Sequence, residues 1–338
     1  MADLTIEDHL QAARDAIAVE DDELDEARRR RRQAEDALRA EFPGCRIVPN
    51  GSLAHGDANT PLTDWDLVVV ISDPDDEYGP GKKSSLDLKE RAKEHLRAAL
   101  SVEYPKLTVT IKGQKRAVLL RYSEPFTPGT TDFTGDVICA IDHPARGLYI
   151  PRHNTWDRSH PEEHTSIVRK ANERTSTAFS RAVRLLKHWN MSHGSPMCSW
   201  HIKVLANEAI TTRLAMQDAL LAFFDHAAAT LETGDTPDPA GVGPDIKTPM
   251  SPTDMVQRLT TAATNLRDAI QAEADGRPLR AQHHLAFVLP DIVPKPDSSA
   301  LDDEDFHYQA RRLGRGPSAG VGPASTLTLP RNRSWRHD

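Results

Sequence analysis

The chain has 338 residues, enough for about two domains, or one domain with two lobes, and for a sizeable core. Hydrophobic residues make up 38% of it, as in ordinary globular proteins, and 42 Lys and Arg against 50 Asp and Glu give a net charge of −8. This balance excludes a basic field over the whole chain for holding nucleic acid. The three cysteines form no C-x-x-C pair, which argues against a disulfide framework or a cysteine-rich zinc site.

The sequence carries no signal for export or for a membrane. Its first residues, MADLTIED, are acidic where a signal peptide would be basic and then apolar. No apolar run approaches the roughly 18 residues of a membrane span. We therefore expect a cytoplasmic protein that makes no use of a membrane.

Residues 5–41 contain no Gly or Pro and predict one long helix or two joined ones. Thr5 is a suitable N-cap, and Pro43-Gly44 ends the pattern. Inside this stretch an acidic block, residues 21–26, precedes five consecutive arginines, Arg28 to Arg32. This pattern favours a solvated helix face with ion pairs along it. A nucleic-acid-binding stripe is the alternative, weakened because the neighbouring acids cancel most of the positive field.

Short apolar runs separated by turns follow, as is typical of a mixed α/β region. The expected strands are residues 46–49, 66–72, 107–112, 117–122 and 136–141, with a helix at 86–102. Beyond Pro161 the pattern becomes helical over 161–193, 199–231 and 252–275, with a loop at 232–252. The residues from Gly314 to Asp338 have little to bury, and we expect a mobile tail there.

The most informative segment is residues 50–70, NGSLAHGDANTPLTDWDLVVV. A short helix beginning at the Gly51-Ser52 turn would present free backbone N–H groups, which suit phosphate. Asp64 and Asp66 open the next strand. Because side chains alternate along a strand, both carboxylates project from one face, and Trp65 points the other way, into the core.

Two parallel carboxylates repel each other unless a cation lies between them, and hard oxygen ligands suit Mg²⁺ or Mn²⁺. A third carboxylate on an adjacent strand would complete a two-metal site for phosphoryl transfer, and Asp136 is the best candidate. An Asp-x-Asp pair alone usually lies in a loop or caps a helix. Its combination with the Gly-Ser turn and a third aspartate on a later strand makes metal binding the favoured interpretation.

These motifs resemble the Gly-Ser-x-x-x-Gly-Thr and Asp-x-Asp signature of the nucleotidyltransferases related to DNA polymerase beta. DVICAI, residues 136–141, resembles the strand that bears the third catalytic aspartate in the cGAS/DncV-like nucleotidyltransferases (CD-NTases). GLYIP, residues 147–151, resembles the loop that follows it there. AVRLLKHWN, residues 182–190, resembles their RLLKYWN helix, and Ser199 begins a helix like the next one. The likeness covers roughly residues 5–290.

The resemblance implies an α+β fold with a polymerase-beta-like nucleotidyltransferase core, in which helices, one of them a long N-terminal helix, flank a mixed sheet. A C-terminal helical lobe would close over the nucleotide. The corresponding division is a catalytic core at 1–155, the lobe at 156–293 and a mobile tail rich in Pro, Gly and Arg at 294–338.

Four further residues are expected to meet the nucleotide. The backbone N–H groups of Gly51 and Ser52 would cradle its phosphates. Lys187 lies off the apolar stripe of its helix, so it is either solvent-exposed or faces the cleft, and the resemblance favours a contact with triphosphate. Ser199 could be only an N-cap, although the corresponding serine of the resembling enzymes contacts phosphates. Asp57 replaces the family's usual Thr, and its sequence position leaves open whether it tilts toward the metal or caps the short helix.

The resemblance also implies the activity: a template-independent nucleotidyltransferase that uses NTPs, ATP or GTP or both, with two Mg²⁺. Asp64 and Asp66 would hold the metal on the triphosphate and share the second metal. Asp136 would hold only the second metal, next to the acceptor hydroxyl. The implied product is a cyclic di- or trinucleotide, or a short oligonucleotide, for bacterial anti-phage signalling through a separate effector protein. The alternatives are transfer to an RNA end or a protein hydroxyl, and an inactive sensor of nucleotide or RNA. A nucleic-acid activator is left open.

Overall fold

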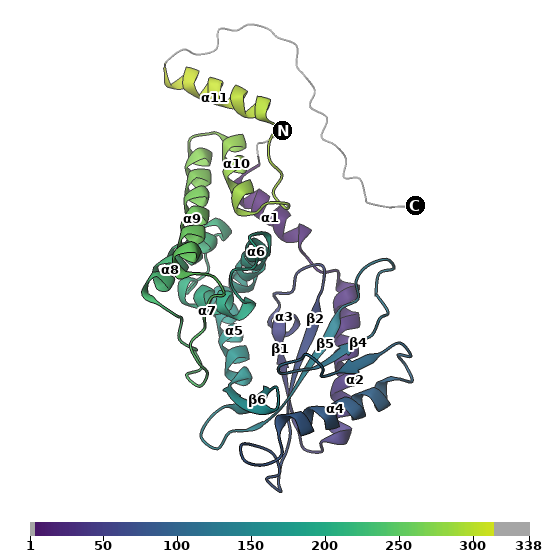
Figure 1. The fold of residues 1–338 in the computed structure, drawn as a ribbon. Coiled ribbons are helices and arrows are strands. Elements are labelled where there is room, and N and C mark those ends of the chain that lie inside the picture. The colour runs from purple at the N-terminus through teal and green to yellow at the C-terminus, as the bar shows by residue number, and fades with distance from the viewer. Residues whose placement is uncertain (1–3, 314–338) are drawn as a thin grey trace. The chain divides into compact units, whose positions relative to one another are not determined.

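The computed structural model describes residues 4–313, which fall into two compact units, one ending at Lys295 and one beginning at Pro296. In the first unit a mixed sheet with its own covering helices is joined to a bundle of helices (Figure 1). This is the α+β architecture expected from the sequence.

The sheet has the strand order β1-β2-β5-β4-β3. Its strands are β1 (Arg46–Asn50), β2 (Asp64–Val70), β3 (Thr108–Thr110), β4 (Val118–Arg121) and β5 (Thr134–Asp142). Strands β2 and β5 pair in parallel and the other pairs are antiparallel, so the sheet is mixed, and all five expected strands are confirmed. The end of β5 also pairs with a hairpin of β6 (Leu148–Arg152) and β7 (Thr155–Ser159), where we expected a loop.

Helices α2 (Asp21–Glu41) and α4 (Ser85–Leu100) cover one face of this sheet (Figure 1). Trp65 points into that layer and is fully buried, as the alternation along β2 predicts. Its neighbour on β5 is Gly135, where an added Cβ would lie 2.2 Å from the indole ring. The opposite face of β2, which carries Asp64 and Asp66, is thereby left for the site.

The helical part has its own apolar core. It is formed by α5 (Pro161–Thr175), α6 (Ala178–Ser192), α7 (Ser199–Ala209), α8 (Met216–Thr233), α9 (Pro252–Ala274), α10 (Pro278–Val288) and α1 (Ile6–Ala16). The N-terminal helical region is thus two helices, α1 and α2, one of the two expected arrangements. It differs from expectation in its packing, because Ile6 and Leu10 of α1 are buried in the helical core and not against the sheet.

Two further differences concern the C-terminal part. In the second unit, α11 (Ser298–Arg312) is helical where an irregular tail was expected from residue 294, and Asp297 caps it by accepting from Ser299 N at 2.8 Å. The tail expected at 314–338 lies outside the described residues. Within residues 4–313 there is no helix with the length and apolar character that a membrane crossing requires.

The arginine run is only partly the solvated face that the charge pattern predicts. Arg28, Arg29 and Arg31 do pair with acids three or four residues away on α2. Arg30 also pairs with Glu26, four residues earlier, but it is only 3% exposed. It donates to Asp132 at 3.0 Å and lies over the rings of Tyr122 and Phe133. A buried guanidinium of this kind belongs to the core between α2 and the sheet.

We predict that Arg30→Gln lowers the free energy of unfolding by about 3–5 kcal/mol, because it leaves the Asp132 carboxylate buried without its partner. Arg32→Gln is the matched control. This side chain is exposed on the same helix, and its replacement should change stability by less than about 0.5 kcal/mol. Urea unfolding of the two variants measures both values, and equal losses would contradict the distinction.

Candidate active site

The pairing of β2 with β5 brings the three predicted carboxylates to one place. Asp66 lies directly opposite Asp136 in the parallel register, and Asp64 is two residues earlier on the same face of β2. Neighbouring strands are about 4.8 Å apart, so these side chains cannot avoid one another. Asp136 Oδ1 is buried and has no hydrogen-bond partner among the described residues.

The pKa values of these carboxyl groups reflect their burial and their mutual repulsion. Burial raises the pKa of Asp66 to about 7, helped by repulsion from Asp64 and Asp136. Burial also raises the pKa of Asp136, and Asp64 adds to that shift. A group of carboxylates that resists ionisation in the free protein is stabilised by any cation placed among them.

The Gly51-Ser52 turn lies against the same carboxylates. The five-residue helix α3 (Gly51–His55) begins where β1 ends, as the sequence predicts. Gly51 has φ +75°, and a Cβ added there would lie 1.7 Å from Asp66 Oδ2. Only glycine lets the backbone approach Asp66 so closely, and this contact places the start of α3 beside the carboxylates.

Lys187 and Asp57 form part of an ion-pair cluster beyond the other end of α3. Asp57 is fully buried, and its two carboxylate oxygens form ion pairs with Lys187 at 3.2 Å and with Lys203 at 2.8 Å. Asp57 is therefore neither a cap of α3 nor free to turn toward a metal, which were the two roles its sequence position left open. The solvent-exposed alternative for Lys187 is wrong.

One cavity of about 410 Å³ gathers most of these groups. The expected site residues on its wall are Gly51, Ser52, Asp64, Asp66, Lys187 and Ser199. Asp136 is not on that wall and lies beside Asp66 on the neighbouring strand. The N-cap of α7 is Cys198, so Ser199 is the first residue of the helix and not its cap.

Sequence reasoning missed two components of this cavity. Lys203, buried in α7, lines it, and a lysine inside the apolar run IKVLA, residues 202–206, is a signal that could have drawn attention. The second component is a tilted ring pair on the same wall, His164 and Trp200, with centroids 4.2 Å apart. Asp238, in the loop after α8, holds His164 by a 3.1 Å hydrogen bond.

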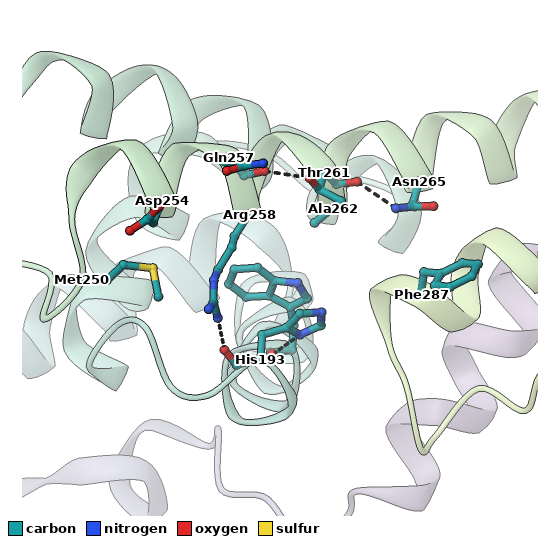
Figure 2. A pocket seen from close by; sticks show the side chains of 10 residues that line it. His193, Met250, Asp254, Gln257, Arg258, Thr261, Ala262, Asn265 and Phe287 are labelled. Atoms are coloured by element: carbon teal, nitrogen blue, oxygen red, sulfur yellow. Dashed lines mark hydrogen bonds between the residues drawn. The ribbon is translucent and has the colours of Figure 1, made fainter.

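A second cavity of about 390 Å³ lies in the helical part, between α6, α9 and α10 (Figure 2). Arg258 reaches across it from α9 to donate to the carbonyl oxygen of His193, and Phe287 faces it from α10. None of the carboxylates or phosphate-binding residues expected from the sequence lines it. The cavity beside β2 is therefore the candidate active site.

The residues beside β2 have the chemistry that Mg²⁺ or Mn²⁺ requires. The orphaned oxygen of Asp136 and the raised pKa of Asp66 both fit a cation among the three carboxylates. Within residues 4–313, no three His, Cys, Asp or Glu side chains are gathered tightly enough to hold an ion by themselves. Mg²⁺ commonly uses one or two carboxylates and completes its shell with water and substrate phosphates, so the donor set is compatible with an ion that arrives with a nucleotide.

The fold is that of the CD-NTases. No family model and no curated protein matches the sequence. Among solved structures, CdnC of E. coli MS115-1, determined with ATP, matches with a TM-score of 0.66 over 85% of this chain and 98% of its own, at 16% identity. The CD-NTase CdnG of Bradyrhizobium diazoefficiens, determined with GTP, matches with a TM-score of 0.62 over 85% and 96%, at 15% identity.

The cyclic AMP-GMP synthase DncV of Vibrio cholerae, bound to the linear intermediate pppA(3′,5′)pG, matches with a TM-score of 0.54. That match covers 79% of this chain and 74% of DncV, at 14% identity. The resemblance first drawn from short motifs thus extends to the fold of most of the chain.

We predict that Gly51→Ala destabilises the protein more than Gly56→Ala. Both residues have left-handed backbone, φ +75° and +71°, so an alanine strains each by about 1 kcal/mol. An added Cβ at Gly56 meets nothing within 4 Å, whereas at Gly51 it overlaps Asp66. This overlap should cost a further 1–3 kcal/mol, roughly the usual range for overpacking. Chemical denaturation of both variants checks the difference, and similar losses would refute the close approach.

We predict that Asp66→Asn makes the metal-free protein more stable than wild type at pH 8 but not at pH 4. The folded state keeps the Asp66 proton up to about pH 7, while the unfolded chain loses it near pH 4, so wild-type stability falls as pH rises between these values. The variant lacks this loss of wild-type stability, which amounts to roughly 4 kcal/mol for a pKa raised from 3.8 to about 7. Urea unfolding in EDTA at several pH values measures it. Asp75→Asn, at an exposed loop position, is the control and should follow the wild-type curve.

Proposed function

We propose that the protein is a template-independent nucleotidyltransferase that joins NTPs into a cyclic di- or trinucleotide, or a short oligonucleotide. One observation carries the proposal: a single cavity combines Asp64 and Asp66, next to Asp136, with the Gly51-Ser52 turn. Carboxylates for metal and groups for phosphate are the two requirements of nucleotidyl transfer from a triphosphate. The likeness to CD-NTase structures, some determined with ATP or GTP, supports the same class of substrate.

In this proposal the chain binds the donor triphosphate between α3 and the two lysines. The backbone N–H groups of Gly51 and Ser52 would meet its phosphates, as expected from the sequence, and Lys187 and Lys203 would neutralise part of its charge from the other side of the cavity. Ser199 lines the same wall and would add a hydroxyl donor. These contacts orient the α-phosphate and stabilise the departing pyrophosphate.

Asp64, Asp66 and Asp136 would hold Mg²⁺ or Mn²⁺. Bound there, two such ions would neutralise the triphosphate and lower the pKa of the acceptor hydroxyl, so that attack can occur near neutral pH. Asp64 and Asp66 open β2 at the cavity wall, and we assign them to the donor side. Asp136 lies one strand further on and is assigned to the acceptor side alone.

The biological setting is also part of the proposal. A cyclic or short oligonucleotide acts through a receptor, so we expect a separate effector protein and a role in anti-phage signalling in the cytoplasm. CdnC, one of the similar structures, has been determined in a complex with a HORMA protein. Transfer to an RNA end or a protein hydroxyl, and nucleotide sensing without turnover, are the competing functions.

The products of the purified protein decide between these functions. We predict that incubation with all four NTPs and Mg²⁺ or Mn²⁺ yields a cyclic or short linear oligonucleotide by mass spectrometry. Asp64→Asn combined with Asp66→Asn should abolish it, because the donor-side metal loses both ligands, while the variant stays folded by circular dichroism. Product formed equally by this variant would show that the pair is not catalytic. Binding of NTPs without turnover by wild type would favour the sensor.

A further inference from the structure

Asp57 lies at the centre of a buried ionic cluster that the expected nucleotide contacts do not explain. Gly56, in left-handed backbone at φ +71°, ends α3 and is followed by this carboxylate, which is 0% exposed. Lys187 reaches Asp57 from α6, and Lys203 reaches it from α7. Three separate segments thus place one negative and two positive groups at the back of the candidate active site.

The hydrogen bonds of the cluster leave each ammonium group one donor. Lys187 Nζ donates to the carbonyl oxygen of Asp57 at 2.8 Å and to its Oδ1 at 3.2 Å. Lys203 Nζ donates to His55 Nδ1 at 2.8 Å and forms an ion pair with Asp57 Oδ2, also at 2.8 Å. An ammonium group has three N–H donors, so among the described residues these contacts leave at least one on each lysine. Both lysines line the cavity, so the remaining donor of each is available to a ligand there.

The protonation state of His55 decides whether it can accept a hydrogen bond from Lys203. Burial lowers the pKa of His55 to about 3, with further lowering by Lys203, so the ring is neutral. Its Nδ1 then accepts from Lys203, and its Nε2–H faces Thr165 Oγ1 at 3.2 Å, which in turn donates to the carbonyl oxygen of Pro49 at 3.1 Å. The pKa of Lys203 is lowered from its usual value, mainly by burial and also by Lys187. Asp57 is the largest influence that raises this pKa, and Asp66 adds a smaller one. Asp57 is therefore the main group that keeps Lys203 charged.

We propose that Asp57 is a positioning residue, whose buried carboxylate holds Lys187 and Lys203 so that one N–H of each faces the phosphates of a bound NTP. The inference rests on the function proposed above and extends it to a residue that touches neither the metal nor the nucleotide. It gives a function to Asp57, which occupies the position where the resembling family usually has Thr. An asparagine has nearly the same shape but no charge, and only one of its two terminal atoms can accept, so it weakens the attraction for both lysines without removing side-chain volume.

A double-mutant cycle separates positioning from simple structural support. Asp57→Asn should lower the melting temperature, because Lys203 stays buried without its counter-charge, and should weaken binding of tripolyphosphate and of α,β-methylene-ATP and -GTP in Mg²⁺. Adding Lys203→Met removes the stranded charge, so the melting temperature should return toward wild type. Affinity should nevertheless stay about tenfold or more below wild type, the effect of losing one hydrogen bond to a charged group, and below that of Lys203→Met alone, because Lys187 also loses its partner. Calorimetric titration and thermal denaturation give the two readouts.

Asp132→Asn is the matched control, since Asp132 is also a carboxylate of low exposure, 9% for its side chain, and is paired with the buried Arg30, and neither residue lines the cavity. It should lower the melting temperature while affinity for the same probes stays at the wild-type value.

Each outcome has a distinct meaning. If the double variant binds the probes as well as Lys203→Met alone does, or if Asp57→Asn loses stability alone, Asp57 only supports the fold and the inference is wrong. If Asp57→Asn does not fold, the comparison of the double variant with Lys203→Met decides, because both lack the stranded charge and differ only at Asp57. If the wild-type chain binds none of the probes, the proposed function itself fails.

Discussion

Repulsion among three carboxylates on two parallel strands is the constraint around which this part of the molecule is built. Asp66 and Asp136 are held side by side by the backbone pairing of β2 with β5, so the side chains cannot separate unless the strands do. The compensation has to come from outside the sheet. It is available from lysines on the helical part and from cations that a ligand would bring, and both meet at the same cavity.

The lysines pair with Asp57 and, among residues 4–313, form no ion pair with Asp66. A lysine bound directly to Asp66 would take the place of a cation and close the site. Asp57, beyond the far end of α3, binds both lysines in place of Asp66. The two ammonium groups therefore line the cavity while the space between the three aspartates stays open to a cation. The short helix α3 thereby separates two electrostatic environments: carboxylates at its beginning and an ion-pair cluster just beyond its end.

Much of the sheet and its carboxylates could be predicted because those signals are local. The alternation of Asp64, Trp65 and Asp66 fixes which side chains share a face, and apolar runs mark each strand. The burial of Arg30 could not be predicted, because five consecutive arginines look alike and only Asp132 and the rings of the folded core distinguish one of them. The pairing of Asp57 with Lys203, 146 positions later in the sequence, likewise depends on how α7 packs.

Helix α1 has a consequence for how the chain reaches its final state. Although α1 is synthesised before the other helices of this core, its apolar residues belong to the core completed by α8, α9 and α10, and the backbone of Ile6 donates to Glu273, 267 positions away. Until the ribosome has produced those later helices, most of the surface that α1 covers is missing. The sheet and its covering helices can close earlier, since their partners lie within the first half of the chain. During synthesis α1 therefore completes its packing only after α10 has been made, later than the sheet and its covering helices can form.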